Sequence, residues 1–299
     1  MKNSSFKPHF DVIVGCVLYG TFGIFLEHIR AMSAGSILFY RLLFGLFALL
    51  FYFCLAGGWK QLKLGKNWKC LVLLAILNTL TSLGYFISIK LSGLSIAVLL
   101  LYTAPVYLSF LAPLLLGEKS SKNLFPLFLA LVGVLLVARP ESLLETPESG
   151  IEPTSFPGLI AGLLSGLAFS GVILATRYLK EDYTGLAKTF WVTALGLVLM
   201  FPFALFTPLP LIFENLNPLL FLGLTATLAV LLHMKGFSGL SAKTGSILAL
   251  LEPVFGILFD HVLLKNPLYS STIEGCFCIL AAATLVSFEG FTRKKRALK

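Results

Sequence analysis

The strongest constraint on this chain is a succession of apolar runs, most of them roughly 18–23 residues long. A helix of about 20 residues spans the ~30 Å hydrocarbon core of a membrane. Only helices and closed barrels satisfy their backbone polar groups inside lipid. The sequence therefore predicts an all-α polytopic membrane protein. We expect ten transmembrane helices, near residues 10–27, 33–55, 70–89, 95–116, 123–138, 157–177, 188–207, 217–233, 242–264 and 270–289.

The charge content excludes an ordinary soluble domain. Only 12% of the 299 residues are charged and 57% are hydrophobic, whereas soluble domains carry about 25% charged residues. The cysteines lie in or next to the predicted spans, and their spacing matches neither a zinc site nor a disulfide framework. We interpret them as packing residues and predict no metal and no cofactor. They are Cys16, Cys54, Cys70, Cys276 and Cys278.

The basic residues gather on one side of the predicted membrane. With the N-terminus inside, 18 Lys and Arg side chains fall on the inner side and 4 on the outer side, and Arg41 lies within a span. Cytoplasmic loops carry such an excess, so both termini are predicted to be cytoplasmic, in a bacterial inner (plasma) membrane. The basic tail, residues 292–299, is interpreted as an anchor that contacts anionic lipid and not as a nucleic-acid site.

Two related halves flank a polar linker. The linker, residues 139–156, holds four glutamates and three prolines and is predicted to be extracytoplasmic. SGLS occurs at residues 92–95 and again at 238–241. APV at 104–106 matches EPV at 252–254. These matches come in the same order in both halves and indicate an internal repeat.

The predicted repeats are residues 1–138 and 157–291, with five spans each. Because five is an odd number, the second repeat would enter the membrane inverted relative to the first. Inverted repeats build alternating-access transporters whose substrate site lies near the membrane midplane. We therefore expect two inverted five-helix repeats around a central cavity.

Five motifs, in this order, resemble the EamA-type transporters of the drug/metabolite transporter superfamily. The resemblance covers nearly the whole chain. The motifs are YGTFGIF (19–25), FYRLLFGLFALL (39–50), YTAPV (102–106), LLLGEKSS (114–121) and LLEPVFGILF (250–259).

The resemblance implies two five-helix halves around a central cavity and cytoplasmic termini. It also implies transport of small metabolites, commonly the export of amino acids and related compounds. Some members import S-adenosylmethionine, and distant relatives move nucleotide sugars. One departure is visible: the first repeat ends in GEKSS, whereas the second ends in KNPLYS, with Asn266 where a second glutamate is expected.

Two prolines occupy matching places in the predicted fourth and ninth spans. Pro105 and Pro253 lack an N–H and clash with the carbonyls of Leu101 and Ala249, so each should interrupt its helix. They are interpreted either as a pair of hinges beside the substrate or as static kinks that shape the packing.

Glu252 lies about ten residues into the ninth predicted span, or ~15 Å deep at 1.5 Å per residue. A charge at the membrane centre costs at least ~2.5 kcal/mol. The side chain must therefore face a cavity, pair with a cation or stay protonated. It is a candidate for binding a proton or a substrate amine, and the alternative is a structural hydrogen bond to a neighbouring helix.

Arg41 lies within the second predicted span. A guanidinium group stays charged and binds carboxylates with two parallel hydrogen bonds. Arg41 is a candidate for a substrate carboxylate, although the favoured interpretation is a structural ion pair with Asp260 near the outer end of the ninth span.

Polar and aromatic side chains at helical spacing complete the predicted substrate site. Asn78, Ser82 and Tyr85 share one face of the third span. For the aromatic candidates the alternative is ordinary packing or an interfacial belt. His233, near an inner span end, is expected to extend toward the interface. The remaining substrate candidates are Tyr19, Tyr40, Tyr102 and Trp191.

The sixth predicted span carries small residues spaced by four: Gly158, Gly162, Gly166 and Ser170. Such a ladder lets two helices approach closely. We assign it to packing inside the protein, with dimerisation as the alternative.

The leading hypothesis is a secondary transporter that moves a small metabolite by alternating access, driven by the substrate gradient or by protons. The chain has no HExxH helix and no GxSxG elbow, so no catalytic residue is predicted. The alternative is a non-transporting scaffold or regulatory protein of the same fold. A polar cavity at the midplane distinguishes the two, and the oligomeric state is not predicted.

Overall fold

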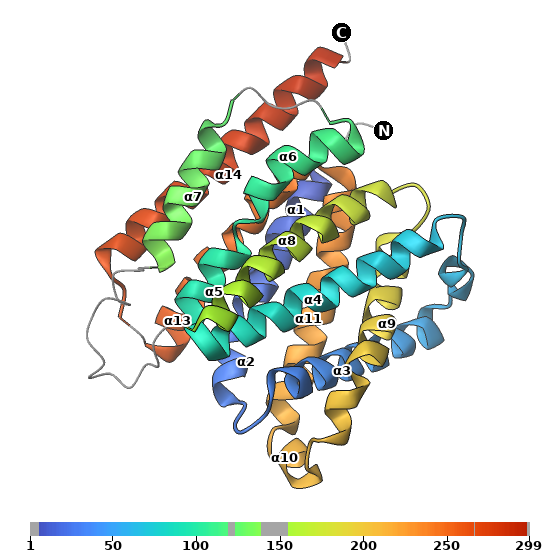
Figure 1. The fold of residues 1–299 in the computed structure, drawn as a ribbon. Helices are drawn as coiled ribbons and strands as arrows, with labels where there is room; N and C mark the ends of the chain where they lie inside the picture. Colours follow the sequence, from blue (N-terminus) through green and yellow to red (C-terminus); the bar gives the residue numbers. More distant parts are fainter. Residues whose placement is uncertain (1–5, 119–122, 139–154, 266, 298–299) are drawn as a thin grey trace.

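A computed structural model describes residues 6–118, 123–138, 155–265 and 267–297 (Figure 1). Throughout these residues the regular secondary structure is helical. The predicted all-α class is therefore confirmed. Most of the predicted linker, and Asn266, lie outside the described residues.

The elements of the described residues follow the order that the apolar runs predict. They are α1 (Lys7–Gly20), α2 (Phe22–His28), α3 (Ala34–Ala56), the 3-10 helix η1 (Trp59–Leu62), α4 (Trp68–Ser92), α5 (Leu94–Leu101), α6 (Ala104–Leu116), α7 (Phe125–Ala138), α8 (Phe156–Tyr178), α9 (Gly185–Leu205), α10 (Leu209–Glu214), α11 (Leu216–Gly239), α12 (Ala242–Ala249), α13 (Leu251–Leu264) and α14 (Ser270–Ala297).

Nine helical segments in the described part of the chain are long and apolar enough to cross a membrane. Three of them combine two elements: α1 with α2, α5 with α6, and α12 with α13. The predicted fifth span, 123–138, corresponds to α7, an apolar helix of 14 residues. The protein is therefore a polytopic helical membrane protein, and the count of ten spans remains a prediction.

Two of the three broken spans are interrupted where the prolines predict. The fourth span breaks at Tyr102 and Thr103, and the ninth breaks at Leu250. Pro105 and Pro253 fall in the first turns of α6 and α13, where a missing N–H costs no helical hydrogen bond. The break of the first span at Thr21, between α1 and α2, has no proline and was not predicted.

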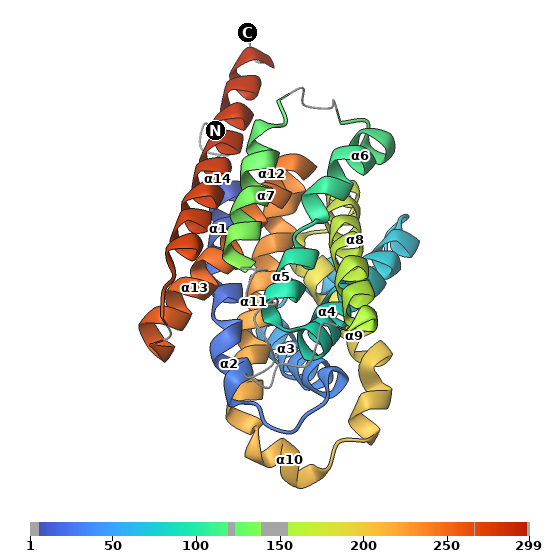
Figure 2. The ribbon, with the colours of Figure 1, turned by 60° about the vertical axis from the view of Figure 1, so that its left-hand side comes forward.

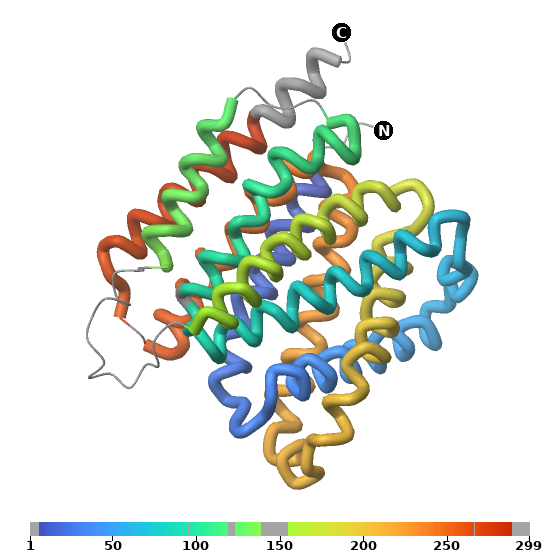
Figure 3. Tube along the Cα trace, in the orientation of Figure 1, coloured from blue at the N-terminus to red at the C-terminus, as the bar shows by residue number. Residues whose placement is uncertain are grey.

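Each proline-associated break is covered by a helix from the other half of the sequence. Helix α8 packs against α5 and α6, and α1 packs against α12 and α13. Helices α4 and α8 also lie side by side (Figure 3). Helices α7 and α14 form a pair along one side of the molecule (Figure 2). Helix α1 begins and α14 ends at the same end of the bundle (Figure 1).

The glycine ladder of the sixth span packs inside the protein, as predicted. A Cβ on Gly166 would lie 2.5 Å from the Leu100 carbonyl oxygen and 2.6 Å from Thr103 Oγ1. Helix α8 therefore approaches the break in the fourth span so closely at Gly166 that a side chain there would clash. The same crossing brings Gly158 and Gly162 against the ends of α4 and α5.

We expect Gly166→Ala to lower the free energy of unfolding by about 1–3 kcal/mol, because the added methyl group forces α8 away from α5. The measurement is thermal unfolding of the purified protein in detergent. Gly23→Ala is the matched control, since nothing lies within 4 Å of the position of its Cβ. Equal unfolding temperatures for the two variants would contradict this close packing.

Candidate functional site

A cavity of about 230 Å³ lies beside the breaks in the first, fourth and ninth spans. We call it the central cavity. Its lining includes the ends of α2, α7 and α13 and the start of α5, at the end of the bundle opposite the start of α1 (Figure 1). Among the predicted residues that line it are Tyr19, Tyr85, Tyr102, Glu252 and Pro253. Four of the predicted substrate residues and one predicted hinge residue thus lie on one cavity wall.

Glu252 lies in the first turn of α13, directly after the break at Leu250. The positive end of the helix dipole favours a carboxylate at this position. Tyr102, from the break in the other half, lies on the same cavity wall as Glu252, and the two side chains influence each other electrostatically. The Arg41 guanidinium also interacts with Glu252 electrostatically. Glu252 therefore lies on the cavity wall beside Tyr102 and near Arg41, and its role stays a prediction.

Arg41 is buried behind the cavity wall, with 4% of its surface exposed. Its Nη2 donates to Ser82 Oγ at 3.1 Å, and its guanidinium carbon lies 5.8 Å and 5.9 Å from the ring centroids of Phe22 and Phe86. The hydrogen-bond partner that the structure gives Arg41 is therefore the Ser82 hydroxyl, and the ion pairs of the described residues do not include the favoured pair of Arg41 with Asp260. Hydropathy places a residue in depth but does not fix which neighbour its helix face meets.

The Nε atom of Arg41 is buried and has no hydrogen-bond partner among the residues that the structure describes. A buried donor without a partner costs about 1–3 kcal/mol, and more when it is charged. Phe22 links Arg41 to the central cavity, because its ring faces the guanidinium and Phe22 also lines the cavity. Arg41 thus keeps an unused donor close to the place where a solute would bind.

Five of the nine predicted substrate residues do not line the central cavity: Arg41 and Ser82, which contact each other, and the three that follow. Tyr40 is buried against Phe39, with the two rings edge to face at 5.1 Å. Trp191 Nε1 donates to the Leu62 carbonyl at 3.1 Å and so fixes η1 to α9. Asn78 lies a turn away from Ser82 on α4 and is half-buried. Their positions favour packing, which was the alternative for the two aromatic residues.

Cys16 and His233 form a buried contact that the sequence did not reveal. The Cys16 thiol faces the carbonyl oxygens of Leu248 at 3.5 Å and Ala249 at 3.7 Å, and lies 3.7 Å from His233 Nε2. Ala249 is the residue whose carbonyl Pro253 frees, so Cys16 supplies a weak donor there. His233 is only 4% exposed. The expectation that it reaches the interface is wrong, because the close passage of Gly15 leaves its ring against α1.

Two charged residues were also missed as site residues. Asp260 also lines the central cavity, about two helical turns after Glu252 on α13. Lys188 is completely buried, and its Nζ donates to the Thr176 carbonyl at 3.1 Å and to Ser238 Oγ at 2.5 Å. In the sequence analysis Lys188 is one of the 18 basic residues counted on the inner side, at the start of the predicted span 188–207. Among the described residues, no group of three His, Cys, Asp or Glu side chains is placed to hold a metal.

We expect Ser82→Ala to lower the unfolding free energy by about 1–2 kcal/mol, because it removes the acceptor of a buried guanidinium donor. Ser287→Ala is the control, since its hydroxyl only bonds back to Ala283 of its own helix. Thermal unfolding in detergent distinguishes the two. A Ser82→Ala variant as stable as the Ser287→Ala variant would show that this hydroxyl does not hold Arg41.

Comparison with known proteins identifies relatives and one solved fold. The chain is 28% identical over 279 residues to an uncharacterized transporter of Archaeoglobus fulgidus, which covers 92% of this chain and 94% of that protein. It is 23% identical to human solute carrier family 35 member G1, over 71% of this chain and 60% of the human protein. A solved crystal structure matches with a TM-score of 0.78 over 96% of this chain and 99% of that chain; at 16% identity, this likeness concerns the fold alone.

A model of the EamA-like transporter family matches residues 8–139 and, separately, residues 156–288. Together these matches include the central cavity and both proline-associated breaks. The chain belongs to the EamA-like transporter family.

Proposed function

We propose that the protein is a secondary transporter that carries a small metabolite across the membrane by alternating access through the central cavity. The observation that carries this proposal is the meeting of Tyr102 and Glu252, one from each proline-associated break, on the wall of one cavity. Non-helical backbone at membrane depth is tolerated where it lines a cavity. In transporters, broken helices of this kind form the substrate site.

The proposal includes two inverted repeats of five helices, residues 1–138 and 157–291. It is supported by the two separate family matches and by the matching breaks, each three residues before a proline. It also agrees with the crossed packing, in which α8 covers one break and α1 covers the other. We keep the orientation given by the basic residues, with cytoplasmic termini in an inner membrane, residues 139–156 as an extracytoplasmic linker and residues 292–299 as a lipid-contacting tail.

The cavity favours a solute of amino-acid size with a positive group, a negative group and an apolar or planar body. Glu252 offers a carboxylate for an amine. Arg41 offers its unpartnered donor for a carboxylate once Phe22 moves aside. Tyr19 and Tyr85 supply aromatic walls. The volume of about 230 Å³ lies below the roughly 300–1,000 Å³ of sites for drug-sized ligands, which favours an amino acid over S-adenosylmethionine or a nucleotide-like solute.

The alternative function, a non-transporting scaffold, predicts a solidly packed centre. The cavity with its polar wall favours a carrier instead. The carrier would rearrange at the breaks near Pro105 and Pro253, and the substrate gradient or a proton on Glu252 would drive it. No catalytic residue is part of the proposal.

The first test is thermal stabilisation of the purified protein by a panel of amino acids, S-adenosylmethionine, purines, nucleotides and sugar phosphates. A ligand that binds only the folded protein raises the unfolding temperature by mass action. The stabilising compound is then followed as a radiolabelled solute into proteoliposomes. Binding without movement across the membrane would favour the scaffold.

We expect Glu252→Gln to abolish the dependence of uptake on an imposed proton gradient, because an amide cannot carry a proton. Counterflow, the exchange of labelled for unlabelled solute without net proton movement, should persist if Glu252 acts only in coupling. The measurement is uptake with and without a pH gradient. Unchanged proton dependence in the variant would remove Glu252 from coupling.

We expect Arg41→Lys to weaken binding of a carboxylate-bearing ligand by roughly tenfold or more, because lysine lacks the planar fork that binds a carboxylate with two hydrogen bonds. Trp191→Phe is the control, since the Trp191 indole bonds to η1 and not to the cavity. Titration by thermal shift or calorimetry gives the affinities. If both variants bind like the parent protein, Arg41 has no contact with the ligand.

A further inference from the structure

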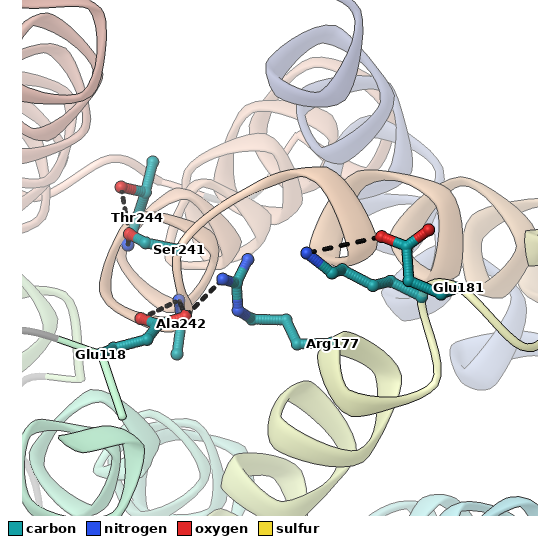
Figure 4. Close-up of polar contacts among 7 residues, drawn as sticks. Glu118, Arg177, Glu181, Ser241, Ala242 and Thr244 are labelled. Atoms are coloured by element: carbon teal, nitrogen blue, oxygen red, sulfur yellow. Dashed lines mark hydrogen bonds and ion pairs between the residues drawn. The ribbon is translucent and has the colours of Figure 1, made fainter. Parts of the chain in front are cut away.

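A charged contact connects the ends of α6, α8 and α12 (Figure 4). It lies at the end of the bundle where α1 begins and α14 ends (Figure 1). Glu118 follows the last turn of α6, and its Oε1 lies 2.5 Å from Arg177 Nη2 at the end of α8. Its Oε2 accepts a hydrogen bond at 3.0 Å from the backbone N–H of Ala242, the first residue of α12. One carboxylate from the first half of the chain therefore binds two helix ends of the second half.

The local chemistry of each partner favours this contact. Ser241 caps α12 by accepting from the N–H of Thr244 at 3.1 Å, which leaves the Ala242 N–H for Glu118. The carboxylate also stabilises the positive end of the α12 dipole. The side chains of Glu118 and Arg177 are only 19% and 18% exposed, so water screens the pair less than it screens a surface ion pair.

The hollow spaces of the molecule differ on the two sides of its centre. The central cavity, about 230 Å³, extends toward the end opposite Glu118. On the Glu118 side there is a hollow of about 50 Å³, whose lining includes Glu118, Ser109 and Ser246. Leu101 and Ala249, at the edges of the two breaks, are buried. In the described residues the hollow on the side of Glu118 is thus much smaller than the central cavity on the other side of the centre.

The sequence has no matching carboxylate at the other end. The first repeat ends in GEKSS, and the corresponding place in the second repeat reads KNPLYS, with Lys265 and Asn266 where Gly117 and Glu118 stand in the first. The carboxylate that forms this ion pair therefore has no counterpart at the matching sequence position of the second repeat. The two closed states of a carrier built from these halves would not be equally stable.

We propose that Glu118, Arg177 and the N–H of Ala242 form a latch that holds the bundle closed on their side. Opening the cavity to that side requires α6 to part from α8 and α12, and so requires this contact to break. The latch therefore sets the resting state of the carrier as open to the opposite side. The inference rests on the proposed function, because such a latch matters only if the cavity opens alternately to the two sides of the membrane.

The test measures which side of the membrane reaches the cavity. A single reporter cysteine, Val98→Cys on the cavity wall, is placed in a protein whose five native cysteines are replaced by serine. Serine at position 16 keeps a donor for the Ala249 carbonyl. A membrane-impermeant methanethiosulfonate is then added to sealed vesicles of either orientation, and the rate of labelling from the latch side is compared with the rate from the far side.

We expect the reporter protein to be labelled quickly from the far side and slowly from the latch side. Glu118→Gln should raise the latch-side rate by roughly tenfold or more, since the latch consists of charge-assisted hydrogen bonds. Arg177→Gln should have the same effect. The double variant should be no faster than either single variant, because both remove one contact.

Glu181→Gln is the matched control. It neutralises a carboxylate at the same end of the molecule, but the Glu181 side chain is 84% exposed and pairs only with its neighbour Lys180 (Figure 4). Its labelling rates should equal those of the reporter protein. Thermal unfolding and intact far-side labelling verify that each variant is folded.

A folded Glu118→Gln variant with the latch-side rate of the reporter protein would overturn the latch. The solute flux in proteoliposomes then shows whether the proposed carrier function is also wrong. If flux is present, the carrier function stands without the latch. If there is no flux and no latch-side labelling in any variant, the proposed carrier function is contradicted as well.

Discussion

A break in a membrane helix leaves backbone groups without partners in a medium that offers no water, and the centre of this protein is organised around that constraint. Each unpaired group buried in hydrocarbon costs several kcal/mol. The breaks at Tyr102–Thr103 and at Leu250 are therefore possible only where other helices or a cavity receive the exposed backbone. Their position next to one cavity follows from this requirement.

The covering helices meet the requirement in two different ways. Helix α8 uses Gly166 to bring its backbone against the Leu100 and Leu101 carbonyls, while Thr103 Oγ1 donates to the Leu100 carbonyl at 2.6 Å. Helix α1 places the Cys16 thiol against the Ala249 carbonyl and passes close to α13 at Gly20. Tyr102 lies at one of these breaks and Glu252 directly follows the other, and both line the cavity. The packing that covers the breaks therefore also positions the polar side chains of the site.

The sequence predicted those features that depend on the hydrophobicity of a segment and on local residue chemistry. Apolar runs gave the helical class and most helix positions, and Pro105 and Pro253 gave two of the three breaks. The partners of Arg41 and His233 were not predictable in the same way. Their neighbours depend on how each helix is rotated, and a span that is apolar on all sides carries little information about rotation. The break at Thr21 lacks a proline, and the role of Glu118 depends on two helix ends far away in sequence.

Lys188 sets an order in which parts of the protein can be completed during synthesis. Its amine is fully buried between the Thr176 carbonyl, which precedes it by 12 residues, and the Ser238 hydroxyl, which follows it by 50 residues. When α9 enters the membrane, only the first of these partners exists. The lysine must keep its charge in water at the membrane surface until α11 arrives, because an ammonium group is not stable in hydrocarbon without partners. The complete set of partners around Lys188 therefore exists only once α11 has been made.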